Sequence, residues 1–135
     1  MQTSPSTVAQ RLHHVAVGSA DVERLAAFYA SIFGLAELGR HQAADGGLRS
    51  IWLDLGGVIL MVEHTDQPPR AVESIGAGPF LLAFRVSPSE RWRIESALER
   101  AGLAVESRTA FTSYARDPDG NRIAFSHHPD PGVPR

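Results

Sequence analysis

Residues 11–34 read RLHHVAVGSADVERLAAFYASIFG, and this stretch decides the fold. Its first part alternates as a strand does, with His14 on one face and Val15 on the other. Asp21 is a good helix N-cap, apolar residues then recur at helical spacing, and Gly34 stands where a helix C-cap is wanted. The stretch therefore predicts a strand that leads directly into an amphipathic helix.

Three apolar runs follow this helix, at about residues 35–41, 48–55 and 58–63, and the turn sequences DGG and LGG separate them. Short apolar runs between turn residues are typical of strands. The first half of the chain is therefore expected to have the order β-α-β-β-β.

The same order of elements returns in the second half. The run FLLAFRV predicts a strand, and SPSE at Ser87–Glu90 predicts a capped helix with proline at its first position. Two strands are expected at about 103–109 and 111–116, and the turn DPDG leads into a last strand, NRIAFSHH. The buried stripe of the second helix is expected at Ile94, Ala97, Leu98 and Ala101.

The repeated order, together with the tripeptide GLA after each helix, indicates an internal duplication. We expect one α+β domain built of two βαβββ modules. The expected division is a flexible leader at 1–10, a first module at 11–63, a linker at 64–79, a second module at 80–128 and a Pro-rich tail at 129–135.

Composition excludes several classes of protein. The formal net charge of -2 creates no strong field that would attract nucleic acid or an anionic membrane. The absence of cysteine excludes disulfides, iron–sulfur clusters, zinc–thiolate sites and a cysteine nucleophile. No apolar run approaches the roughly 20 residues that a membrane-spanning helix needs. We expect a cytoplasmic protein with no nucleic-acid or membrane partner.

Two segments, LHHVAVGSADVERLAAFYASIFGL and YARDPDGNRIAF, together resemble the vicinal oxygen chelate superfamily. That superfamily includes glyoxalases, bleomycin-resistance proteins, extradiol dioxygenases and fosfomycin-resistance enzymes. The resemblance extends from about Arg11 to Ser126 and implies two βαβββ modules whose curved mixed sheets enclose a cleft, often completed by a homodimer. Because such a fold hosts several chemistries, the site has to decide the function.

The resemblance also implies a divalent ion in the metal-using relatives, held by ligands from the first and last strand of each module. His14 matches the first of these positions. The other three fall at Leu60 or Met61, at Leu81 and at Ala124. Three of the four ligands are therefore missing, and we expect neither a metal of the family type nor another cofactor.

Glu63 and His64 are the nearest substitutes for a missing ligand. A displacement of two residues along a strand is roughly 7 Å, too far for the usual site without local distortion. We interpret the pair as the solvated end of a strand, and a relocated metal site remains the alternative.

His14 and Tyr114 are the candidate catalytic residues. A neutral imidazole suits general acid–base catalysis, and a satisfied structural histidine is the alternative. Tyr114 precedes Ala124 by a spacing similar to that of a tyrosine in extradiol dioxygenases, and its phenol could donate a hydrogen bond to a substrate. A cross-strand aromatic contact is the alternative for Tyr114.

The candidate ligand-binding residues are Trp52, Leu60, Leu81, Arg85, Arg122 and Ala124. Trp52 is either a stacking wall for an aromatic ligand or a core side chain. Arg85 and Arg122 either bind an anionic ligand or extend into solvent from the strand ends.

Our leading hypothesis is a metal-free protein that binds a small organic ligand in the cleft between the modules, similar to bleomycin-resistance proteins. The alternative is an enzyme of the same superfamily, a glyoxalase-like lyase, an isomerase or a dioxygenase type. Such an enzyme would act through His14 and Tyr114 or through a relocated metal site. A homodimer is expected in either case.

Overall fold

The computed structural model describes residues 8–68 and 81–132. The expected leader at 1–10, linker at 64–79 and tail at 129–135 lie partly outside the described residues, as does the first residue of the predicted strand FLLAFRV. No helix within the described ranges is long and apolar enough to cross a bilayer.

The first module has the predicted order. Its elements are β1 (His14–Ser19), α1 (Val22–Phe33), β2 (Glu37–Gln42), β3 (Leu48–Asp54) and β4 (Ile59–His64). Its strands form one mixed sheet in the order β1-β4-β3-β2, in which β1 is parallel to β4 and the other neighbours are antiparallel.

The second module repeats this arrangement. Its elements are β5 (Leu81–Arg85), α2 (Pro88–Arg100), β6 (Ser107–Arg108), β7 (Thr112–Arg116) and β8 (Arg122–Ser126). The strand order β5-β8-β7-β6 is the equivalent of the first sheet, with β5 parallel to β8. The prediction of an α+β fold with two βαβββ modules is confirmed.

The strand expected at 103–109 is wrong for most of its length, because β6 has only 2 residues. The backbone N–H of Leu103 donates instead to the carbonyl of Leu98 at 2.9 Å. The chain therefore closes the end of α2 before it joins the sheet.

Both predicted N-caps form. The Asp21 carboxylate accepts a hydrogen bond from the Arg24 backbone N–H at 3.1 Å, and the Ser87 hydroxyl accepts one from Glu90 at 3.1 Å. Helix α1 ends at Gly34, whose φ of 67° lies in the left-handed region where other residues are strained.

The stripe predicted for α2 is partly wrong. Ile94 and Leu98 are buried, but Ala101 is exposed, because the helix ends at Arg100 and Ala101 is already its C-cap.

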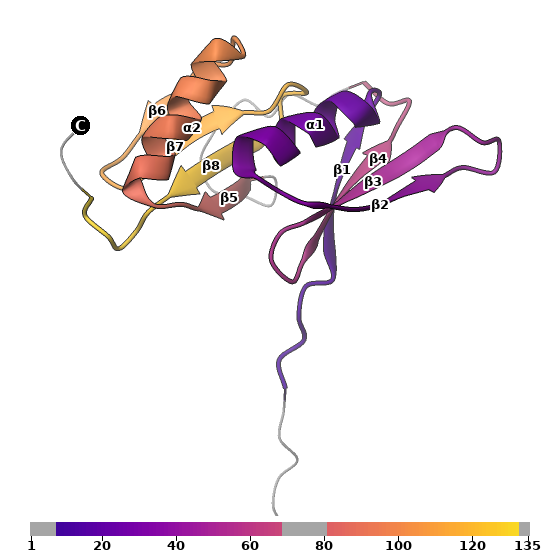
Figure 1. The fold of residues 1–135 in the computed structure, drawn as a ribbon, viewed down its shortest axis with the longest axis horizontal. Helices are drawn as coiled ribbons and strands as arrows, with labels where there is room; N and C mark the ends of the chain where they lie inside the picture. The colour runs from indigo at the N-terminus through magenta and orange to yellow at the C-terminus, as the bar shows by residue number, and fades with distance from the viewer. Residues whose placement is uncertain (1–7, 69–80, 133–135) are drawn as a thin grey trace, which may run out of the picture.

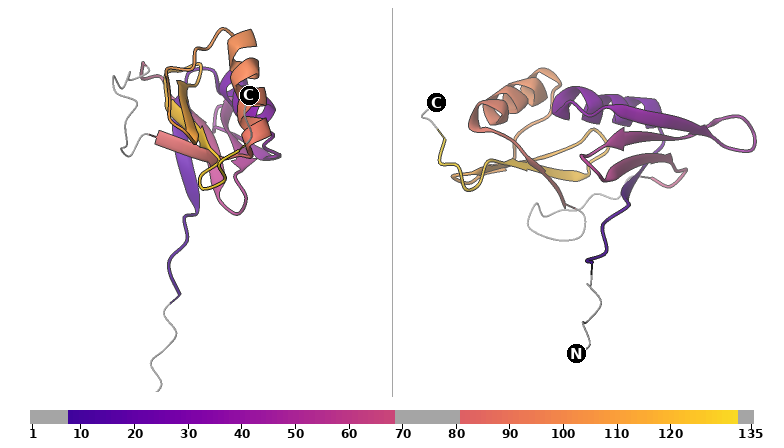
Figure 2. Two further views of the ribbon diagram at one scale, coloured as in Figure 1. Left: turned by 90° about the vertical axis from the view of Figure 1, so that its left-hand side faces the viewer. Right: turned by 60° about the horizontal axis from the view of Figure 1, so that its bottom comes forward.

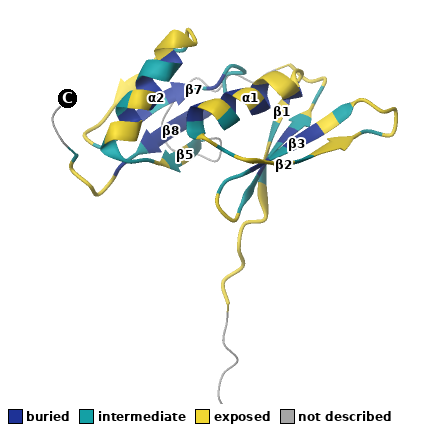
Figure 3. Cartoon of the chain, viewed as in Figure 1, coloured by how far each residue is buried: buried dark blue, intermediate teal, exposed yellow. Residues whose placement is uncertain are grey.

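Both helices lie on the same side of the two sheets (Figures 1 and 2). Burial alternates along the strands accordingly, as Figure 3 shows for the strand interiors. Leu60 and Val62 of β4 are completely buried, whereas Met61 between them is half-buried. We call the other side of each sheet, which points away from the helices, its helix-free face.

Aromatic rings of α1 join the two modules. Phe33 stacks on Phe84 of β5 with centroids 3.9 Å apart and planes 11° apart, and it meets Phe125 of β8 edge-on. Burial of a large apolar side chain contributes about 1.5–3 kcal/mol, so this shared cluster holds the sheets together.

A polar contact also joins α1 to the second module, and it involves Asp117 in the predicted DPDG turn. The Gly120 N–H donates to the Asp117 carbonyl at 3.0 Å, which closes the turn, and the Tyr29 hydroxyl donates to the Asp117 carboxylate at 2.6 Å. Burial raises the pKa of Asp117, and burial together with the nearby Asp117 raises the pKa of Tyr29. The DPDG motif therefore has a structural role in this chain.

Candidate functional site

The helix-free face of the first sheet carries the candidate His14. The residues of this face, which we call the first-sheet face, are His14, Ala16 and Gly18 of β1; Ile59, Met61 and Glu63 of β4; Ser50, Trp52 and Asp54 of β3; and Gly39 and His41 of β2. For β1 the sequence predicted this alternation, with His14 and Val15 on opposite faces.

Leu60 does not lie on this face. It is completely buried, its register partners are Val15 and Leu53, and it belongs to the core under the helix. Met61 lies on the same face as His14, so it is the residue that stands at the position matched to a ligand in metal-using relatives.

Trp52 is half-buried and lies outside the buried core cluster. Its indole N–H donates to the Ser50 hydroxyl at 3.1 Å, and its ring centroid lies 4.3 Å from that of His41. Part of the indole is therefore accessible, which fits the stacking interpretation of Trp52 better than the core interpretation.

Glu63 and His64 point to opposite faces of β4. Glu63 shares the first-sheet face, and exposed His64 lies 3.6 Å from Asp66. Glu63 is level with Gly18 of β1, four residues along the strand from His14, which corresponds to about 13 Å. Glu63 and His14 are too far apart to hold one ion together.

The helix-free face of the second sheet brings five predicted residues together. The residues of this face, which we call the second-sheet face, are Leu81, Ala83 and Arg85 of β5; Arg122, Ala124 and Ser126 of β8; Thr112, Tyr114 and Arg116 of β7; and Ser107 of β6. Tyr114 lies directly beside Ala124, and Leu81 lies directly beside Arg122.

These residues differ in accessibility. Arg122 is 4% exposed and Ala124 is 1% exposed, whereas Tyr114 is half-buried and Arg85 is exposed. Arg85 therefore extends into solvent, as one alternative for it predicted, whereas Arg122 is buried and does not. The register partner of Arg122 on β7 is Arg116, whose guanidinium donates to Glu106 at 2.9 Å.

His14 is exposed, and its Nδ1 lies 2.8 Å from Nδ1 of His13. One of these nitrogens must donate and the other accept, so the bond orients the His14 ring and leaves its Nε2 outside this contact. His14 and Tyr114 lie on different sheets and make no hydrogen bond with each other.

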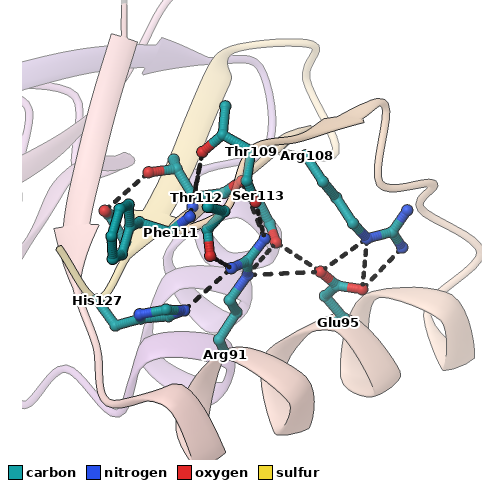
Figure 4. A network of polar contacts seen from close by, with 10 residues as sticks. Arg91, Glu95, Arg108, Thr109, Phe111, Thr112, Ser113 and His127 are labelled. Carbon is teal, nitrogen blue, oxygen red and sulfur yellow. Dashed lines mark hydrogen bonds and ion pairs between the residues drawn. The ribbon is translucent and has the colours of Figure 1, made fainter. Parts of the chain in front are cut away.

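A buried polar network, missed by the sequence analysis, lies between α2 and the second sheet (Figure 4). Arg91 and Glu95 are 2% and 1% exposed. The Arg91 guanidinium donates to the Ser113 hydroxyl at 2.8 Å, and the same hydroxyl donates to Glu95 at 2.5 Å. Arg108 donates to the Glu95 carboxylate from the solvent side, at 2.8 Å for the shortest contact.

The backbone and His127 complete this network. Arg91 donates to the carbonyls of Thr109, Ala110 and Thr112 at 2.9 to 3.1 Å. His127 Nδ1 lies 2.6 Å from the Asp130 carbonyl and must donate to it, so Nε2 accepts from Arg91 at 3.0 Å. Burial lowers the pKa of Arg91.

The sequence does contain a signal for this network. Positions 91 and 95 fall on the same helical stripe as Ile94 and Leu98, at spacings of three and four residues. Charged residues on that stripe require buried partners, so they mark a polar network rather than a solvated face.

Two hollows lie elsewhere on the surface. One of about 340 Å³ is lined by Arg85, Val86, Ser87, Glu90, His127, Pro129 and Asp130. The other, of about 600 Å³, is lined by Glu23, Arg40, His41, Gln42, Gly46 and Leu48. The first includes the candidate Arg85, and neither includes His14 or Tyr114.

The residues at the four implied metal positions do not fit a divalent ion of the family type. His14, Met61, Leu81 and Ala124 all lie on helix-free faces, and His14 alone among them offers a nitrogen or oxygen ligand. Within residues 8–68 and 81–132, no group of three His, Cys, Asp or Glu side chains could hold an ion.

Solved structures support the assignment of the fold. A glyoxalase/dioxygenase from Nostoc punctiforme is 25% identical, with a TM-score of 0.71 over 95% of this chain and 100% of that one. A lactoylglutathione lyase from Agrobacterium tumefaciens is 20% identical, with a TM-score of 0.61 over 93% and 96%.

A fosfomycin resistance protein, FosX from Listeria monocytogenes, was solved as a mutant with Mn(II) and a dihydroxypropylphosphonic acid. It is 15% identical, with a TM-score of 0.72 over 88% of this chain and 93% of that one. No curated protein matches the chain closely enough to count as a relative.

The family model described as "Glyoxalase/Bleomycin resistance protein/Dioxygenase superfamily" matches residues 11–125. This span covers both modules almost completely, and it agrees with the strand order of the two sheets. The chain therefore belongs to the glyoxalase/bleomycin resistance protein/dioxygenase superfamily.

Proposed function

We propose that this member of the superfamily binds a small organic ligand on the helix-free faces of its sheets without a bound metal ion, as bleomycin-resistance proteins are expected to do. One observation supports this proposal above the others. The positions where metal-using relatives are expected to carry ligands hold His14, Met61, Leu81 and Ala124. Three of these four side chains are apolar, and apolar surface suits an organic ligand.

Two side chains could orient such a ligand. The accessible part of the Trp52 indole can stack on an aromatic group, and the Tyr114 hydroxyl can donate a hydrogen bond. We expect a homodimer in which a second copy helps to enclose the ligand, and the oligomeric state is to be measured with the same samples.

Isothermal titration calorimetry with a panel of aromatic compounds and glycopeptide antibiotics tests the proposal. We expect saturable binding that Trp52→Ala weakens by about tenfold, since loss of a stacked indole is worth 1–2 kcal/mol. Trp92→Ala on α2 is the matched control and should change the affinity by less than about twofold. Saturation by no compound of the panel would count against the proposal.

Elemental analysis of the dialysed protein belongs to the same experiment. Near-stoichiometric Mn, Fe, Ni or Zn would favour a relocated metal site and the enzymatic alternative. In a metal-free enzyme, His14→Ala would abolish turnover and retain ligand affinity. If the protein only binds its ligand, the ligand should be recovered chemically unchanged after long incubation with the protein.

A further inference from the structure

Glu63 stands out on the first-sheet face because no residue in the described part of the chain compensates its charge. It is half-buried, and within the described residues its carboxylate takes part in no hydrogen bond or ion pair. Its register partners are Gly18 on β1 and Ser50 on β3. Neither residue carries a charge, so no neighbour of Glu63 on β1 or β3 neutralises its carboxylate.

Trp52 is the diagonal neighbour of Glu63 on the same face of the sheet. Its register partner on β4 is Met61, and Glu63 is the next residue of β4 on the same face. Diagonal neighbours of this kind on one face of a sheet are about 7–8 Å apart, within reach of one bound group. On the β2 side, next to Gly39, the His41 ring lies against the indole with centroids 4.3 Å apart, so a bound group would approach the indole from the β4 side, where Glu63 lies.

The two helix-free faces also differ in the sign of their charges. The first-sheet face has two carboxylates, Glu63 and Asp54, and no arginine. The Asp54 carboxylate is used by the turn after β3, where it accepts from the backbone N–H of Gly56 at 2.7 Å. The second-sheet face has Arg85, Arg116 and Arg122 and no strand carboxylate.

We infer that the first-sheet face is a subsite for an organic cation, whose ammonium group lies over the Trp52 indole and beside the Glu63 carboxylate. Tryptophan is the best aromatic partner for a cation, and a neighbouring carboxylate adds a counter-charge without a metal. The inference rests on the proposed function and names the class of ligand group that this half of the site accepts.

The test uses choline and its neutral isostere 3,3-dimethylbutan-1-ol, which have the same shape and differ in charge. In a Trp92→Phe background, Trp52 is the remaining tryptophan of the chain, so its fluorescence reports binding at this face. We expect saturable quenching by choline and binding of the neutral alcohol that is weaker by about tenfold. The titrations are performed at physiological ionic strength to screen long-range effects.

The variant Glu63→Gln should weaken choline binding by about five- to tenfold and leave the alcohol unaffected. Asp66→Asn removes the same charge from a fully exposed position 3 residues away and is the matched control. Its effect should stay below about twofold, because exposed charges interact weakly. Circular dichroism verifies that each variant is folded.

Three results would overturn the inference. The first is equal affinity for choline and the alcohol, and the second is an equal effect of Glu63→Gln and Asp66→Asn. The third is a loss of self-association in Glu63→Gln with unchanged choline affinity, which would assign the carboxylate to an arginine of a second copy. Binding of neutral aromatic compounds in the calorimetric panel would in each case leave the proposed function standing.

Discussion

Tyr29 and Asp117 are 88 positions apart in the chain and form one of the shortest hydrogen bonds described here, 2.6 Å between Oη and Oδ2. Tyr29 is completely buried and Asp117 is 2% exposed, so the bond is sheltered from water. Asn121 also donates to the same carboxylate oxygen, at 2.8 Å. A buried carboxylate needs such donors, because an unsatisfied charge inside a protein is costly.

We therefore expect Tyr29→Phe to lower the free energy of unfolding by about 1.5–3 kcal/mol, the range for hydrogen bonds to a charged group. Urea denaturation monitored by circular dichroism measures the change. Tyr114→Phe is the control, since its hydroxyl takes part in no hydrogen bond within the described residues. The control should differ from wild type by less than about 0.5 kcal/mol. Equal effects in both variants would contradict the role of Asp117.

The sign of the pH dependence follows from the same contact. Burial raises the pKa of Asp117 above its ordinary value of 3.8. The folded state then binds a proton more tightly than the unfolded state, so the stability that this proton contributes is lost as the pH rises from 3.8 through the folded pKa. Carboxylates whose pKa is lowered by an ion pair stabilise the fold more as the pH rises, and the contribution of Asp117 to the free energy of unfolding changes in the opposite direction.

At the scale of the element, α2 is held to its sheet by charges as well as by Ile94 and Leu98. Glu95 accepts from Ser113 and from Arg108, and its carboxylate lies 4.0 Å from the Arg91 guanidinium. A buried ion pair adds little compared with apolar packing, but removing one partner leaves the other charge uncompensated.

Glu95→Ala should accordingly lower the free energy of unfolding by about 3–5 kcal/mol, because Arg91 would remain buried without its carboxylate. Glu99→Ala, one turn further along the exposed side of the same helix, should change it by less than about 0.5 kcal/mol. Thermal and urea denaturation of the two variants provide the comparison. A small effect of Glu95→Ala would mean that the helix is held by its apolar contacts alone.

The elements that could be predicted from the sequence are those in which local signals agree. The alternation in β1, the Asp21 cap and Gly34 define the first strand and helix. Five predicted residues also share one face of the second sheet, which follows from period-two alternation once the register is known; these are Leu81, Arg85, Tyr114, Arg122 and Ala124.

The rest depends on contacts that are distant in the chain. The sequence analysis assigned no role to Arg91 and Glu95, because their partners lie far away in the chain, on β6, β7 and after β8. The choice between Leu60 and Met61 required the register of β1 with β4. A shift of one residue reverses the face of every side chain on a strand, and no local pattern fixes it.

At the scale of the whole molecule, the two sheets are separate, but their core is shared. Phe33 and Tyr29 of α1 contact Phe84 of the second module, and one continuous cluster of buried residues includes side chains from both halves. A module cannot unfold alone without exposing this cluster to water, so the halves should unfold together.

Single-tryptophan variants test this cooperativity. Trp52 in Trp92→Phe reports on the first module, and Trp92 in Trp52→Phe reports on the second. We expect the midpoint of urea unfolding from fluorescence to equal that from circular dichroism within each variant. A fluorescence transition that precedes the loss of secondary structure would mean that the modules unfold separately.

The stacking of Phe33 on Phe84 has a consequence for how the sequence of the chain can change. Two modules with separate sheets could vary independently, but here the helix of one supplies a ring that a strand of the other must accommodate. An insertion that lengthened α1 by one residue would rotate its last turn by about 100° and withdraw Phe33 from its neighbour. Changes in the two modules are thus linked, because the length of a helix in the first module limits which strand the second module can present.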